Sequence, residues 1–136
     1  MLDTSVVGAA MRSPTGASAA LLMRARKGKV TLLANVALAL EYEAACRRVE
    51  HAVAAGLTAD EVGTFVDAVL AMVEPVESHF VWRPLLRDPA DEMVLEAATS
   101  GSAAAIVTFN QLDFGVVPLQ FGVEVLTPAA ALRRIK

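Results

Sequence analysis

The feature that most constrains this sequence is the alternation of short apolar runs with longer stretches of helical pattern. Four runs, at residues 30–33, 72–76, 105–108 and 123–126, have the length and composition of buried strands. Parallel strands need a long crossover between them, usually a helix, and helices then cover both faces of the sheet. The sequence therefore predicts a three-layer α/β/α fold with a central, mostly parallel sheet.

Local signals mark where the predicted helices begin. Asn35, Asp88 and Thr127 are residue types that cap helix N-termini, and Thr58 with Glu61 has the spacing of a capping box. An irregular stretch at residues 77–87 separates the second strand from the helix after it. The helices we expect are 17–27, 35 to about 55, 58–70, 88 to about 99, and one that begins at residue 127.

Length and composition narrow the class of protein. A chain of 136 residues fits one domain, residues 1–136. The hydrophobic fraction is 55% and the mean hydropathy is +0.50, which predicts an apolar surface for self-association or for a partner. No apolar run reaches the roughly 18 residues of a membrane span, and no basic segment precedes an apolar stretch as in a secretory signal. We therefore expect a cytoplasmic protein.

Charge and cysteine content exclude further classes. The formal net charge is −3 and the isoelectric point is near 5.3, which is not the basic footprint of a protein that binds nucleic acid by charge alone. A nuclease with a carboxylate-lined site can still have this balance once metal ions are bound. The one cysteine, Cys46, excludes an internal disulfide and is expected to be a buried thiol.

Polar residues gather where the predicted strands end. Asp3 interrupts the apolar opening MLDTSVV and ends a first strand of two or three residues. Glu41 and Asp91 lie in early turns of helices that follow strands, and Asn110 and Asp113 follow the strand AIVTF. Open α/β sheets bind ligands outside the carboxyl ends of their strands. We expect these five side chains to converge at that edge.

Each of these residues also has an ordinary structural interpretation. Asp3 can simply end a strand, and Glu41 can lie on a solvated helix face. Asp91 falls in the first turn of a helix, where a carboxylate interacts favourably with the helix dipole. Asn110 and Asp113 can form turns. Spacing alone leaves both interpretations open.

Four segments occur in the order and at about the distances typical of PIN-domain ribonucleases: LDTSVV, LLANVALALEYEAACRR, RDPADEMVLEAA and AIVTFNQLDF. The sequence resembles this family along nearly its whole length, and within it the VapC-like toxins of type II toxin–antitoxin pairs. The resemblance implies a PIN-like fold and a metal-dependent endoribonuclease. It also implies that Asp3, Glu41, Asp91 and Asp113 bind Mg²⁺ or Mn²⁺.

The sequence departs from the family pattern at the fourth acid. Many PIN domains have an aspartate two residues after the threonine, where this chain has Asn110, so Asp113 is expected to replace it. Ser5 matches a small polar residue that supports the site. Carboxylates about 4 Å apart repel by roughly 4 kcal/mol at an effective dielectric constant near 20. A divalent cation relieves this repulsion, and Mg²⁺ and Mn²⁺ prefer oxygen ligands.

Substrate contacts are less sharply indicated. Basic side chains are candidates for phosphate contacts, and two residues of the irregular stretch are candidates for stacking on a base. Their ordinary interpretations are solvated arginines and a tryptophan packed on the core. The candidates are Arg12, Arg24, Arg83 and Arg87 for phosphate, and His79 and Trp82 for stacking.

The resemblance also implies partners. VapC-like toxins form homodimers and are held inactive by a cognate antitoxin whose tail enters the acidic groove. The alternative is a PIN-like module that has lost activity and binds RNA or a protein partner without turnover. Asn110, at a position where many relatives have an acid, motivates this alternative.

Overall fold

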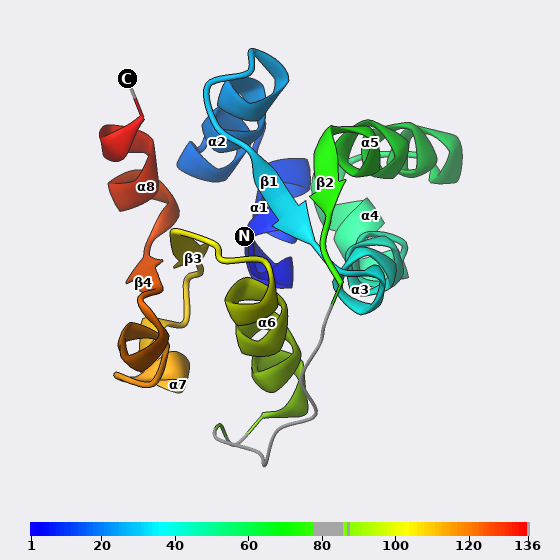
Figure 1. Ribbon diagram of the computed structural model, residues 1–136. Coiled ribbons are helices and arrows are strands. Elements are labelled where there is room, and N and C mark those ends of the chain that lie inside the picture. Colours follow the sequence, from blue (N-terminus) through cyan, green and yellow to red (C-terminus); the bar gives the residue numbers. More distant parts are fainter. Residues whose placement is uncertain (78–85, 87, 136) are drawn as a thin grey trace.

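Figure 1 shows the computed structural model, which describes residues 1–77, 86 and 88–135. Helices alternate with short parallel strands, so the predicted α/β class is confirmed. The elements are α1 (Thr4–Arg12), α2 (Ala17–Arg26), β1 (Leu32–Ala34), α3 (Val36–Cys46), α4 (Val49–Ala55), α5 (Ala59–Met72), β2 (Val73–Pro75), α6 (Pro89–Ser100), β3 (Ala105–Val107), α7 (Gln111–Phe114), the 3₁₀ helix η1 (Pro118–Phe121), β4 (Glu124–Leu126) and α8 (Pro128–Arg134).

The strands pair in two parallel ladders. β1 lies beside β2 with Leu32 opposite Val73, and β3 lies beside β4 with Ala105 opposite Glu124. The first strand that the sequence predicted is a single bridge, Leu2 to Val107, and this bridge extends the β3–β4 pair. Each strand of the two ladders has three residues. Over the described residues the two ladders are separate two-stranded sheets, where the sequence predicted one central sheet.

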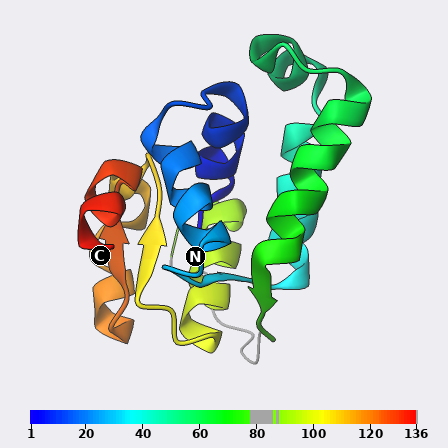
Figure 2. The same cartoon turned by 90° about the horizontal axis from the view of Figure 1, so that it is seen from above.

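The helices divide between two ends of the molecule. β3 and β4 lie at one end with α8, and α4 and α5 lie at the other (Figures 1 and 2). α1 packs against α2, α3 and α4, so it joins the two ends. The largest fully buried side chains include Leu38, Leu95, Ile106 and Phe114, from four different elements. Cys46 is buried as expected, and burial raises the pKa of its thiol. In the described part of the chain, no helix has the length and apolar character to cross a bilayer.

The predicted helix caps are confirmed. The side chain of Asn35 accepts a hydrogen bond from the Leu38 amide at 2.8 Å. Thr58 and Glu61 form the reciprocal capping box at the start of α5. Asp88 and Thr127 each accept a backbone N–H in the first turn of α6 and α8. These caps satisfy amides that a helix N-terminus leaves without a partner.

Residues 4–12 form a helix that the sequence analysis did not predict. The β-branched side chains of Thr4, Val6 and Val7 lower local helix propensity, and Gly8 lowers it further. Burial of Val6, Val7, Ala10 and Met11 on one face compensates for this. Packing therefore decides this segment against its own propensity.

The single helix expected from residue 35 to about 55 is wrong, because the chain breaks after Cys46. Arg48 has extended backbone angles, and α4 begins at Val49 in a new direction. The Ala45 carbonyl near the end of α3 accepts the Arg48 amide at 3.3 Å and lies 2.8 Å from Nδ1 of His51. These polar groups provide the hydrogen bond that a continued helix would have supplied. The break turns Arg48 and His51 toward α1.

Tyr42 attaches α3 to the start of the chain. Its buried hydroxyl donates a hydrogen bond to the Leu2 carbonyl. Burial and the charge of Asp3 raise the pKa of Tyr42, so the hydroxyl remains a donor. The bond fixes the backbone immediately before Asp3, one of the predicted metal ligands.

We predict that Tyr42→Phe lowers the free energy of unfolding by about 1–2 kcal/mol, because it leaves the buried Leu2 carbonyl without its donor. Urea denaturation followed by circular dichroism measures this. Thr64→Val is the matched control, because it removes an exposed hydroxyl that bonds the Asp60 carbonyl, and its effect should stay within about 0.5 kcal/mol. Equal effects of the two substitutions would contradict the tethering role of Tyr42.

Candidate active site

Asp3 lies between the bridge to β3 and helix α1, and its carboxylate faces the end of β3. It occupies the N-cap position of α1, but its side chain makes no capping bond. Its Oδ2 atom instead accepts hydrogen bonds from Thr108 Oγ1 at 2.7 Å and from Ser5 Oγ at 3.2 Å. Asp3 is 8% exposed. Helix capping therefore does not account for this buried carboxylate.

Thr108 orients Asp3 from the residue directly after β3. It is fully buried, and its Oγ1 accepts the backbone N–H of Asn110 at 3.0 Å. A hydroxyl has one proton to donate, and here that proton goes to Asp3. The backbone bond thus fixes the direction in which the Thr108 hydroxyl donates to the carboxylate.

Asp91 lies in the first turn of α6 and is also buried. The capping bond of this helix is made by Asp88, so Asp91 has a different environment from an ordinary cap. Burial is the largest cause that raises the pKa of Asp91 to about 6, followed by the charges of Asp88, Asp3 and Asp113. The helix dipole by itself would favour the opposite shift. Three carboxylates therefore lie close enough to oppose ionisation of this one.

A hollow of about 410 Å³ opens between α6 and α7, and we call it the acidic pocket. Asp88, Asp91 and Asp113 line it from two helices. The remaining lining is mainly apolar and consists of Leu86, Leu112, Phe114, Gly115 and Val117. The carboxylates thus share a concave site with an apolar wall, which strengthens electrostatic interactions inside it.

The structure brings together three of the predicted acids and places the fourth elsewhere. The charges of Asp3 and Asp113 both act on Asp91 and raise its pKa. Glu41 is not among the acids that shift Asp91, and its Oε1 lies 3.8 Å from Nη2 of Arg48. Asn110 is exposed at the N-cap position of α7 without a side-chain cap bond.

Glu41 lines a second hollow of about 290 Å³, which we call the basic pocket. This pocket lies between α1, α3 and α4, and Ser5 lines it as well. The sequence predicted Ser5, Arg12 and Glu41 as functional residues but missed Arg48, His51 and Phe109, because these side chains converge from separate elements. The lining residues are Thr4, Ser5, Gly8, Arg12, Glu41, Ala45, Arg48, His51 and Phe109.

Of the predicted contacts to the substrate phosphate, one lines a pocket and one does not. Arg12 lines the basic pocket, whereas Arg24 on α2 lines neither pocket. The four predictions that fall in the irregular stretch lie outside the described residues: His79, Trp82, Arg83 and Arg87.

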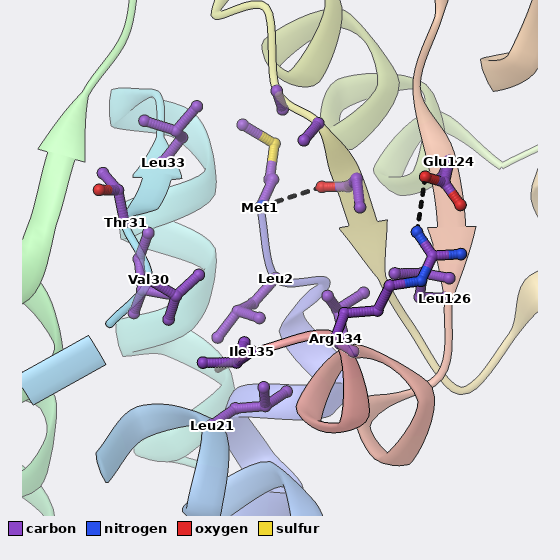
Figure 3. Close-up of a pocket in the computed structure, with 16 residues that line it drawn as sticks. Met1, Leu2, Leu21, Val30, Thr31, Leu33, Glu124, Leu126, Arg134 and Ile135 are labelled. Atoms are coloured by element: carbon purple, nitrogen blue, oxygen red, sulfur yellow. Dashed lines mark hydrogen bonds and ion pairs between the residues drawn. The ribbon is translucent and has the colours of Figure 1, made fainter. Parts of the chain in front are cut away.

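A third hollow, of about 240 Å³, has a different character (Figure 3). Met1, Leu2, Leu21 and Ile135 contribute to its mainly apolar lining. Its acid, Glu124, is bound to Arg134 at 2.8 Å, as the dashed line in Figure 3 marks. None of the predicted acids lines this hollow, so it is not the candidate active site.

The donor set fits a divalent cation in chemistry and charge. Carboxylate oxygens are the ligands that Mg²⁺ and Mn²⁺ prefer, and the pKa of Asp91 is raised first by burial and then by the negative charges of Asp88, Asp3 and Asp113, which a cation would offset. Over residues 1–77, 86 and 88–135, no three acidic, His or Cys side chains are already arranged to hold an ion. The charges of Asp88, Asp3 and Asp113 all act on Asp91, and of these four acids the sequence predicted Asp3, Asp91 and Asp113 as ligands.

Parallel strands with carboxylates gathered in a hollow are typical of α/β proteins that bind a ligand near the ends of their strands. A family model described as PIN domain matches residues 1–112, so the chain belongs to the PIN domain family. PIN domains are typically metallo-nucleases that use divalent ions, and PIN nucleases bind RNA. The resemblance seen in the sequence is therefore confirmed at the level of the family. No curated protein and no solved structure gives a significant match.

We predict that Asp91→Asn stabilises the metal-free protein above pH 6. The pKa of Asp91 is raised to about 6, so the native state binds this proton more tightly than the unfolded chain. Wild-type stability should therefore fall, relative to the variant, as the pH rises from about 4 to 7, by about 2 kcal/mol.

Thermal and urea denaturation in EDTA at pH 4 and pH 7.5 measure this difference. Asp67→Asn, which removes an exposed acid from α5, is the matched control and should give the same small difference at both pH values. An Asp91→Asn variant less stable than wild type at pH 7.5 would contradict a cost of ionising Asp91 in the folded protein.

Proposed function

We propose that this protein is a metal-dependent endoribonuclease, the cytoplasmic toxin of a type II toxin–antitoxin pair. The proposal rests on the position of the Asp3 carboxylate. Asp3 is the N-cap residue of α1, but its carboxylate makes no capping bond and accepts hydrogen bonds from Thr108 and Ser5 beside the acidic pocket. Burial of a charge is costly unless donors or a cation compensate for it. A site that accepts this cost at the ends of parallel strands is suited to binding a cation.

Asp3, Asp91 and Asp113 are the residues we assign as ligands of Mg²⁺ or Mn²⁺, and Glu41 is the fourth by resemblance. The bound ion would lower the pKa of a water and stabilise negative charge on the phosphate. Thr108 and Ser5 orient Asp3 by donating hydrogen bonds to Oδ2. Asp91 is the buried acid of this pocket, whereas Asp113 lies on its exposed side.

We predict that the purified protein cleaves RNA in the presence of Mn²⁺ or Mg²⁺ and loses this activity in EDTA. Asp3→Asn and Asp91→Asn should each reduce cleavage at least about 100-fold, because each removes a charged ligand. Thr108→Val should reduce it about 10- to 100-fold, because groups that orient a ligand have effects of this size. Gel electrophoresis of several structured RNAs measures the rates.

Asp67→Asn is again the control and should cleave at the wild-type rate. Absence of cleavage, with the protein folded and the metal bound, would contradict the enzyme and favour the alternative of a PIN-like binding module. Cleavage that survives EDTA would contradict the metal.

The toxin assignment includes two protein partners. Exposed apolar side chains on α3 and α4, namely Val36, Leu40, Val49 and Val53, support a surface for self-association. The acidic pocket is suited to a basic side chain of an antitoxin tail, because its carboxylates already oppose one another.

We predict a homodimer at tens of micromolar, measured by light scattering. Replacing both Val49 and Val53 by Asp should give monomers, because these side chains are 75% and 74% exposed on α4 and would be covered in the dimer. Ala68→Asp adds a charge to the exposed face of α5 and should leave the dimer intact. A single monomeric wild-type species would contradict the dimer.

A further inference from the structure

We infer that the basic pocket is a binding subsite for one nucleotide of single-stranded RNA, with the base stacked on Phe109 and the phosphate held by Arg12 and Arg48. The substrate class rests on the proposed function. The subsite itself rests on the residues that the fold gathers there.

The basic pocket lies beside the predicted metal ligand Asp3. Ser5 lines the basic pocket and donates to Asp3, so the two sites meet at that carboxylate. Phe109 follows Thr108, which binds the same Asp3 oxygen, and precedes the helix that carries Asp113. An RNA strand held in the basic pocket would therefore lead directly to the acidic pocket.

The basic pocket is bordered by the aromatic ring of Phe109. Its side chain is 53% exposed, although the residue before it is fully buried. The aromatic ring thus borders the pocket without being enclosed in the core. Stacking on an exposed aromatic ring is the usual way in which proteins bind unpaired bases of any sequence.

Basic side chains line the same pocket as the ring of Phe109. Arg12 comes from the last turn of α1, Arg48 precedes α4, and His51 lies in α4. Within the described part of the chain Arg12 forms no salt bridge, and Arg48 has only a loose contact with Glu41, at 3.8 Å between exposed side chains. Such a contact contributes little, so both guanidinium groups can bind phosphate.

The shape of the pocket depends on Gly8 and His51. A Cβ atom at Gly8 would lie 3.2 Å from Nη1 of Arg12 and would push the guanidinium aside. Nδ1 of His51 lies 2.8 Å from the Ala45 carbonyl, which fixes the ring and leaves Nε2 for a ligand. The volume of about 290 Å³ is at the lower end of the range for small-molecule sites, which suits one nucleotide.

The aromatic ring of Phe109 favours a nucleotide over an acidic peptide as the occupant. Glu41 lines the pocket and Asp3 lies at its edge, so a phosphate and a carboxylate would both meet like charges, and the ring is what distinguishes the two ligands. A nucleotide has one phosphate charge and a base, and the pocket offers an aromatic ring for that base.

The test is binding of a fluorescent, single-stranded RNA, measured by anisotropy in EDTA, in which the proposed nuclease has no metal ion for cleavage. Phe109→Leu should weaken binding about tenfold, whereas Phe109→Tyr, which restores a ring, should bind within about twofold of wild type. Arg12→Gln and Arg48→Gln should each weaken binding and reduce its salt dependence. Arg24→Gln, on α2 outside both pockets, is the matched control and should bind as wild type.

The subsite is overturned if wild type does not bind, or if Phe109→Leu and both glutamine variants bind like wild type. It is also overturned if an oligoglutamate peptide displaces the RNA at equal concentration, because the pocket would then recognise acidic protein. Binding with the predicted losses but without cleavage of ordinary RNA supports the subsite while the nuclease proposal fails. The two proposals are therefore distinguishable.

Discussion

The site depends on one buried hydrogen bond, from Thr108 to Asp3, which joins residues 105 positions apart. Backbone pairing makes this bond possible, because the Asp3 amide donates to the Val107 carbonyl and the Val107 amide donates to the Met1 carbonyl. The register places the carboxylate beyond the last residue of β3. Tyr42 holds the same segment from α3. These bonds together hold Asp3 in its buried position.

The placement of acids that suits the site to binding a cation lowers the stability of the metal-free protein. Burial, followed by the charges of Asp88, Asp3 and Asp113, raises the pKa of Asp91 to about 6, so ionisation of Asp91 makes the metal-free fold less stable. The core is built from small and medium apolar side chains such as Val6, Val94 and Ile106, and their burial offsets this cost. Acids kept together against their repulsion are typical of functional sites.

The sequence was most informative where the signal is local. The caps at Asn35, Thr58, Asp88 and Thr127 each need only a few neighbouring residues, and all four lie where they were expected. The parallel pairing followed from apolar runs separated by helices. The family followed from four segments in order, and the match over residues 1–112 confirms it.

The rest depends on contacts between distant segments. The helix at residues 4–12 forms because its buried face overrides its weak propensity, and the break after Cys46 was hidden by a continuous helical pattern. Spacing placed Glu41 on the correct helix but did not show that it would face Arg48. Phe109 and His51 become neighbours of the site only after α1, α3 and α4 have packed, so no short motif contains them.

The central claim is that the acids around Asp3 form a metal-binding cluster. Calorimetric titration of Mn²⁺ into the metal-free protein, beside Asp3→Asn and the exposed-acid control Asp67→Asn, tests it most directly. The account predicts specific binding by wild type and by Asp67→Asn, and its loss in a folded Asp3→Asn protein. Equal Mn²⁺ binding by wild type and Asp3→Asn would contradict the account, because the buried carboxylate would then have no part in holding the ion.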